Sequence, residues 1–167
     1  MTYTPQHIAN YFLAKAEEDG RPLTPLKLIK LVYIAYGWVL GLLGTRLFEE
    51  RIEAWKHGPV IPSIYHEFKH FGGGAITDDA VWYDLDTGDC RRPTIDSSDR
   101  DLQIILDKVW AAYKRFSGWA LRQKTHEVGT PWEQTYDPNV KGKQIPDDLI
   151  KPHFQQKIRE IVDAAER

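Results

Sequence analysis

The pattern most suggestive of catalysis is the run HEFKH over residues 66–70, which reads H-E-x-x-H. On a helix, His66 and His70 share one face and can bind one zinc ion, while Glu67 can act as a general base on a zinc-bound water. Such a site needs a third protein ligand, and the position that supplies a histidine in the extended motif is Ile76. Two exposed histidines on a short polar helix are the simpler interpretation. A zinc-dependent hydrolase is the alternative, and no other cofactor is indicated.

Other reactive side chains give weaker patterns. Cys90 is the single cysteine, and the two arginines after it could lower the pKa of its thiol, but no histidine lies near it in sequence. We interpret it as an incidental residue of a turn or hairpin. The glycine run 72–74 lacks the following Lys-Ser/Thr of a phosphate-binding loop. Lys27 and Lys30 could bind phosphate, although a solvated helix edge is the favoured interpretation for both.

Composition narrows the class of protein. With 22 Lys and Arg against 24 Asp and Glu, the chain of 167 residues has a formal charge of -2, which argues against a protein that coats nucleic acid. One cysteine permits no internal disulfide, and the polar start of the chain does not resemble a signal peptide, so we expect a cytoplasmic protein. The longest stretch without charge, residues 31–45, is shorter than the ~20 residues that cross a bilayer, which favours a core helix over a membrane span.

Caps and apolar spacing predict a mainly α (α+β) fold, with residues 1–167 forming one compact helical domain. Helices are expected over about 5–19, 25–43, 62–71, 98–116, 119–127 and 147–165, with a further cap at Thr130. Strands are expected at 51–55, 81–85 and 90–95, enough for a small hairpin or a two- to three-stranded sheet.

Several details of these elements are also predicted. Gly37 and Gly41 lie on one face of the second helix and predict close packing of a neighbouring helix. Ser98, three residues before Asp101, resembles the start of a capping box. The last helix carries an apolar stripe made of Phe154, Ile158, Ile161, Val162 and Ala165. The Gly58-Pro59 pair predicts a turn that leads into the third helix.

Two long segments, residues 26–38 and 52–65, carry a resemblance that extends over nearly the whole chain. Leu47, Phe48 and Glu50 fit between them, and Thr125-His126-Glu127, Pro131-Trp132, Ile145 and Phe154 fit downstream. The chain resembles the Panacea domain, the SocA-like or PanA antitoxin family of phages and other mobile elements. Its most specific part is Ala-Trp-x-x-Gly-Pro-Val at residues 54–60. It departs from the family in having Ile29 and Tyr36 where glutamine is common.

The resemblance implies a bacterial antitoxin that is not an enzyme. Members pair with a cognate protein toxin, usually encoded next door, and neutralise it by direct binding. One member acts instead as an adaptor that delivers its toxin to a ClpXP-type protease. The resemblance places His66 and His70 outside the family motif. Some members add helix-turn-helix regions that this chain lacks, which argues against DNA binding.

Two groups of residues are singled out within this resemblance. A structural role is expected for the family-motif residues Trp55, His57, Gly58, Pro59, Val60, Tyr65, His126 and Trp132. The aromatic residues of the middle segment, Trp82 and Tyr83, are candidate toxin contacts, because exposed aromatic side chains favour binding hot spots. Trp38, like Trp55 and Tyr65, is expected to help build the fold.

Overall fold

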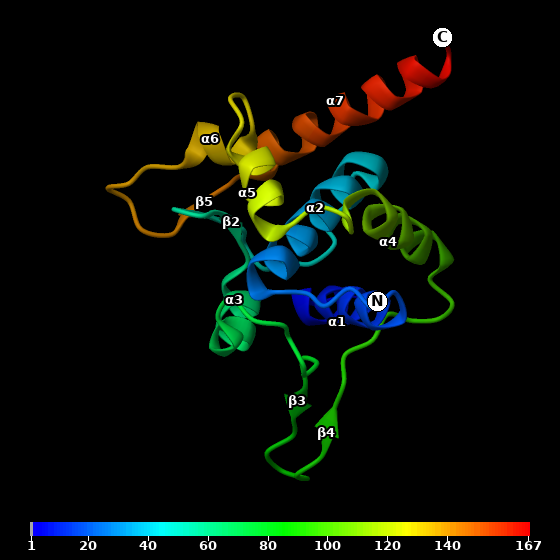
Figure 1. The fold of residues 1–167 in the computed structure, drawn as a ribbon, viewed down its shortest axis with the longest axis vertical. Coiled ribbons are helices and arrows are strands. Elements are labelled where there is room, and N and C mark those ends of the chain that lie inside the picture. Colours follow the sequence, from blue (N-terminus) through cyan, green and yellow to red (C-terminus); the bar gives the residue numbers. More distant parts are fainter. Residues whose placement is uncertain (1) are drawn as a thin grey trace.

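The computed structural model describes residues 2–167 and is built mainly of helices, with a small sheet at one side (Figure 1). The helices are α1 Pro5–Glu18, α2 Pro25–Leu43, α3 Pro62–Phe68, α4 Arg100–Tyr113, α5 Gly118–His126, α6 Pro131–Thr135 and α7 Asp147–Ala165, with a short 3-10 helix, η1 Lys69–Phe71. The strands are β1 Glu53–Trp55, β2 Gly58–Val60, β3 Trp82–Tyr83, β4 Cys90–Arg91 and β5 Lys143–Gln144. The predicted α+β class is confirmed.

Helix α2 lies at the centre of the fold, and it contacts α1, α3, α4, α5, α7 and β2 (Figure 1). From Leu28 to Gly37 every residue is buried, as expected for a helix that is apolar on all faces. By length and composition, α2 is apolar enough to cross a membrane. However, 67% of the relevant window is buried inside the fold, as in the core helix of a globular protein.

Local capping signals set most helix boundaries. The Thr24 Oγ1 accepts from the Lys27 N–H at 3.3 Å, and α2 ends at Gly44 with a left-handed φ of 73°. Thr130 caps α6 in the same way. The predicted cap of α4 is wrong by one residue: Asp99 accepts from the Leu102 N–H at 3.3 Å. The Asp99 carboxylate therefore caps the N-terminus of α4 in place of the Ser98 hydroxyl.

The larger sheet is antiparallel and has the strand order β2-β1-β5. Glu53 pairs with Val60 and Trp55 with Gly58, so the turn consists of Lys56 and His57. The turn predicted at Gly58-Pro59 is therefore wrong, because both residues lie in β2. An edge strand tolerates proline, since one side of its backbone needs no ladder partner. Strand β5 was not predicted.

Helix α7 packs against α2 from its first turn to Ile158. Phe154 is buried against Gly37 and Gly41, which confirms the predicted close packing of a helix at this pair. Beyond Phe154, α7 extends away from the body of the molecule toward the C-terminus (Figure 1). The predicted apolar stripe therefore continues onto the surface, where Ile161 is 60% exposed.

Candidate partner-binding surfaces

The family-motif residues come together although about 70 residues of chain separate them. The Trp132 Nε1–H donates to the Trp55 carbonyl oxygen at 2.7 Å, which ties α6 to the end of β1. The His126 ring lies 3.7 Å from the Trp132 ring, measured between centroids. Trp132 is buried, and its indole joins two distant segments of the motif. This geometry fits a structural role for these two residues.

Gly58 and Pro59 interact closely with a buried lysine of α2. The Lys30 Nζ donates to the Pro59 carbonyl oxygen at 3.0 Å. Gly58 has a φ of 109°, and a Cβ there would lie 2.9 Å from the Lys30 Cε. Only glycine suits that backbone and that space. Lys30 is 1% exposed, so its interpretation as part of a solvated helix edge is wrong.

Burial changes the electrostatics of this lysine. Loss of hydration, and then the positive charge of Arg122, lower the pKa of Lys30 to about 7. No local pattern indicates that Lys30 is buried, because lysine side chains are mostly exposed in folded proteins. Its burial depends on strand β2, which covers it from a distant part of the chain.

The remaining motif residues divide between the core and the surface. Val60 is buried, and Trp55 and Tyr65 are half-buried with their rings edge to face at 4.8 Å between centroids. His57 is exposed in the turn between β1 and β2. Trp38 is half-buried in α2 and does not lie deep in the core.

The H-E-x-x-H residues do not form a metal site. His66 lies on α3 and His70 on η1, and both are exposed. The Lys69 Nζ lies 3.4 Å from the His66 Nδ1, and the His70 ring packs on Phe71. Among residues 2–167, no group of three His, Cys, Asp or Glu side chains is placed to hold a metal ion. The motif therefore lacks the third ligand that a zinc hydrolase needs.

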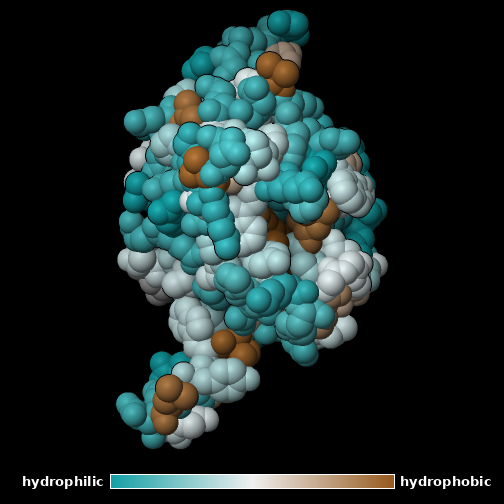
Figure 2. All heavy atoms as spheres, turned by 90° about the vertical axis from the view of Figure 1, so that its left-hand side faces the viewer, coloured by the Kyte–Doolittle hydropathy of each residue, from teal (hydrophilic) through white to brown (hydrophobic). Residues whose placement is uncertain are grey.

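Strands β3 and β4 form a narrow hairpin, the arm, over residues 81–92, which extends from the body of the molecule (Figures 1 and 2). Tyr83 is 71% exposed and Leu85, at its turn, is fully open to solvent. Trp82 is also exposed, although one edge of its ring meets the His7 ring. The arm also carries Cys90, which is exposed and unpaired.

One buried side chain of α1 holds both ends of the arm. The Asn10 Nδ2 donates to the carbonyl oxygens of Ala80 and Pro93, each at 2.9 Å. The Ala80 N–H in turn donates to the Asn10 Oδ1 at 2.8 Å. An ion pair between Arg92 and Asp79, at 2.6 Å, closes the base from outside. The arm is exposed, but its base has a fixed position on the core.

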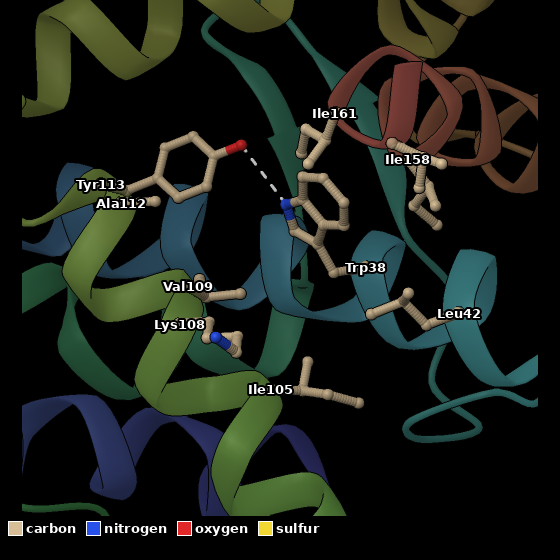
Figure 3. A pocket seen from close by; sticks show the side chains of 10 residues that line it. Trp38, Leu42, Ile105, Lys108, Val109, Ala112, Tyr113, Ile158 and Ile161 are labelled. Atoms are coloured by element: carbon tan, nitrogen blue, oxygen red, sulfur yellow. Dashed lines mark hydrogen bonds between the residues drawn. The ribbon is translucent and has the colours of Figure 1, made fainter. Parts of the chain in front are cut away.

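A second exposed surface is the apolar groove where α2, α4 and α7 meet (Figure 3). It encloses about 280 Å³. Its residues are Trp38, Leu42, Ile105, Lys108, Val109, Ala112, Tyr113, Ile158, Ile161 and Val162. The Trp38 Nε1–H donates to the Tyr113 hydroxyl at 3.3 Å, so even this polar group is satisfied inside the groove. Lys108 is its single charged residue.

Sequence reasoning missed the groove. The apolar stripe of α7 is visible in the sequence, but nothing in the sequence shows where α7 leaves the body of the molecule. Leu42 is 48% exposed for the same reason: α7 passes over Gly37 and Gly41 and leaves the last turn of α2 open. The groove arises from the relative placement of three helices.

Comparisons with known proteins agree with one another. The sequence profile of the family described as "Antitoxin SocA-like, Panacea domain" matches residues 28–133. The curated antitoxin SocA of Caulobacter vibrioides (strain NA1000 / CB15N) is 32% identical over 152 residues, which cover 89% of this chain and 80% of that protein. No solved structure gives a significant match to this chain.

Proposed function

The chain belongs to the SocA-like, Panacea-domain antitoxin family, and on that premise we propose that it neutralises a cognate protein toxin by binding to it directly. The observation that carries this proposal is the apolar groove between α4 and α7. Exposed apolar grooves rimmed by polar residues are candidate sites for binding a protein partner. The proposal needs no catalytic step in the antitoxin itself.

The groove has the composition of an interface centre. Leu42, Ile161 and Val162 are each about half exposed, and Trp38 offers a large flat side chain beneath them. Helix α7 also carries charged residues next to the groove residue Ile158 in sequence, namely Lys157 and Arg159. An apolar segment of the toxin would fill the groove, and contacts at its edge would exclude water around it.

The arm is the second proposed contact. Exposed tyrosine and tryptophan side chains bury much surface for little loss of conformational freedom, and they often dominate binding energy. Tyr83 and Trp82 are carried on a segment whose base is fixed by Asn10. We infer that the arm adds specificity to the apolar contact made by the groove.

The decisive experiment uses the toxin encoded beside this chain, expressed in bacteria with and without it. Co-expression should restore growth, and the two proteins should copurify. Ile161→Asp puts a charge into the groove and should abolish rescue. Ile104→Asp is the matched control, because Ile104 is 53% exposed on α4 but does not line the groove. Equal rescue by the two variants would show that the groove is not the contact.

The arm is tested in the same assay. Tyr83→Ala removes the exposed ring and should weaken the complex by about 1–2 kcal/mol, whereas Tyr83→Phe keeps the ring and should bind almost normally. Calorimetric titration of the purified toxin measures both. An unchanged affinity for Tyr83→Ala would remove the arm from the interface.

A proteolytic variant of this function makes a different prediction. If the chain delivers its toxin to a ClpXP-type protease in the cytoplasm, the toxin should turn over faster when both the chain and the protease are present. If binding alone neutralises the toxin, rescue should be the same in cells without the protease. Pulse-chase labelling of the toxin in both strains separates the two routes.

A further inference from the structure

A second hollow lies on the opposite half of α2 from the apolar groove and has a different chemistry. It is bounded by the first turns of α2, the β1–β2 turn, α3 and α5, and it encloses about 370 Å³. The residues that matter here are Lys30, Trp55, His57, Tyr65, Trp119 and Arg122. We call it the cationic pocket. Its volume lies in the range of small-molecule sites.

The charged residues of the lining are all positive, and no carboxylate is among them. Lys30, Lys69 and Arg122 all contribute to it, and within residues 2–167 none of the three forms an ion pair with Asp or Glu. This concentration of unpaired positive charge occurs in a chain whose net charge is -2. An excess of one sign in a concave site attracts ligands of the opposite sign.

Two of these cations, the buried Lys30 and the half-buried Arg122, keep unused hydrogen-bond donors. The Lys30 ammonium has three donors and makes one hydrogen bond, to the Pro59 carbonyl oxygen. The Arg122 Nε is buried and has no partner at all. Buried donors without a partner are costly, so such groups usually have a role that supplies one. An anion in the pocket would supply acceptors to both.

The positive field also affects a histidine at the mouth of the pocket. Partial burial, and then the charges of Arg122, Lys56 and Lys30, lower the pKa of His57. The lowered pKa of His57 is therefore consistent with a positive electrostatic potential in the pocket.

Flat aromatic side chains form the walls. The Arg122 guanidinium lies 4.9 Å from the centre of the Trp119 ring, and the Lys69 Nζ lies 5.9 Å from that of Tyr65. Trp119 is 60% exposed, so much of its ring surface is free to stack on a ligand. Together the walls and the cations would suit a molecule with a planar ring next to an anionic group.

We propose that the cationic pocket binds a small organic phosphate that carries a flat ring. Arg122 and Lys69 would contact the phosphate oxygens, Lys30 would donate from the floor, and Trp119 would stack on the ring. More than one cation favours a phosphate over a single carboxylate, because a phosphate brings up to two negative charges and three strong acceptors. This site is independent of toxin binding, so its test stands apart from that of the proposed function.

The test is isothermal titration of the purified chain with AMP at low ionic strength. AMP should bind saturably with one site, while inorganic phosphate and adenosine should each bind at least about tenfold more weakly. Inorganic phosphate binding as tightly as AMP would overturn the role of the ring. Adenosine binding as tightly would overturn the role of the cations. Absence of AMP binding at millimolar concentration would overturn the site.

Variants assign the contacts. Arg122→Gln should weaken AMP binding about tenfold or more, and Trp119→Ala, at an exposed position that leaves the core intact, should weaken it severalfold. Lys124→Gln is the control, because it removes a positive charge from the same helix outside the pocket. Equal losses in Arg122→Gln and Lys124→Gln would show a diffuse charge effect and would overturn the proposal.

Discussion

The ring of Phe154 occupies the space that a side chain on Gly37 would need: a Cβ on Gly37 would lie 2.0 Å from the Phe154 Cε2. This contact joins α2 to α7 at the point where α7 begins to leave the body of the molecule. The same two helices line the apolar groove, through Trp38 and Leu42 of α2 and Ile158, Ile161 and Val162 of α7.

Gly37→Ala is therefore predicted to destabilise the fold. Alanine has a higher helix propensity than glycine by about 1 kcal/mol, which alone would stabilise α2. The clash with Phe154 outweighs this, because the ring is buried in a packed core, and we expect a net loss of about 1–3 kcal/mol. Urea unfolding followed by circular dichroism measures it. Gly73→Ala, with nothing within 4 Å of its Cβ, should change little; an equal loss there would contradict the packing argument.

Asn10→Ala should release the base of the arm. It removes three hydrogen bonds and leaves the Ala80 N–H and the carbonyl oxygens of Ala80 and Pro93 without this partner, at a cost of about 2–3 kcal/mol. Limited proteolysis should then cut within residues 81–92 much faster than in the unchanged protein. Asn139→Ala, on an exposed turn, is the control. The same rate of cleavage in both variants would show that Asn10 does not hold the base of the arm.

Lys30 should make stability depend on pH. Its folded pKa of about 7 lies below the usual 10.5, so between these values the unfolded chain binds the extra proton. The free energy of unfolding should therefore rise with pH across this window. Below pH 7, Lys30 is protonated in both the folded and the unfolded chain, so its effect on stability no longer changes with pH. Relative to Lys30→Met, the free energy of unfolding should increase by about 2 kcal/mol from pH 6.5 to 9. A parallel pH dependence in both proteins would contradict this.

The measurements on Lys30 should stop at pH 9, because two buried tyrosines affect stability at higher pH. Burial raises the pKa of Tyr33 and Tyr36 above the usual value of 10. These tyrosines ionise more readily in the unfolded chain, so their contribution to stability is lost as the pH rises above about 10. Measurements there would mix two opposite effects.

Trp132→Phe tests the bond between the two halves of the family motif. Phenylalanine keeps most of the buried ring but removes the indole N–H that donates to the Trp55 carbonyl oxygen. The variant should lose about 1–2 kcal/mol in thermal or urea unfolding. Trp119→Phe, at an exposed position, should unfold normally. A stable Trp132→Phe protein would mean that the contact is incidental.

Helices with strong local signals were predicted well from the sequence. Thr24-Pro25 and Gly44 bound α2, and Thr130-Pro131 starts α6, because caps act through neighbouring backbone groups. The arm was also expected, with longer strands than it has. The start of α4 was missed by one residue, since Asp99 and Ser98 are both good caps and the geometry of the preceding turn selects between them.

Features that depend on distant contacts could not be predicted. Strand β5 has two residues and forms only because the chain returns beside β1. Lys30 is buried by a strand some thirty residues away, and the exposure of Ile161 follows from the angle at which α7 crosses α2. The candidate aromatic contacts Trp82 and Tyr83 were found from their residue type, whereas the groove and the cationic pocket needed the fold.

Because Asn10 holds both ends of the arm, the segment between them can be exchanged without changing how it is attached. Entry and exit of the arm, at Ala80 and Pro93, are bonded to the same amide, so the two ends stay together whatever lies between them. Lengthening a closed loop costs little, about 0.6 kcal/mol for each doubling. Segments of other sequence and length could therefore be grafted in place of residues 81–92 without refolding the core. Recognition of a different partner could then evolve by exchange of a single loop.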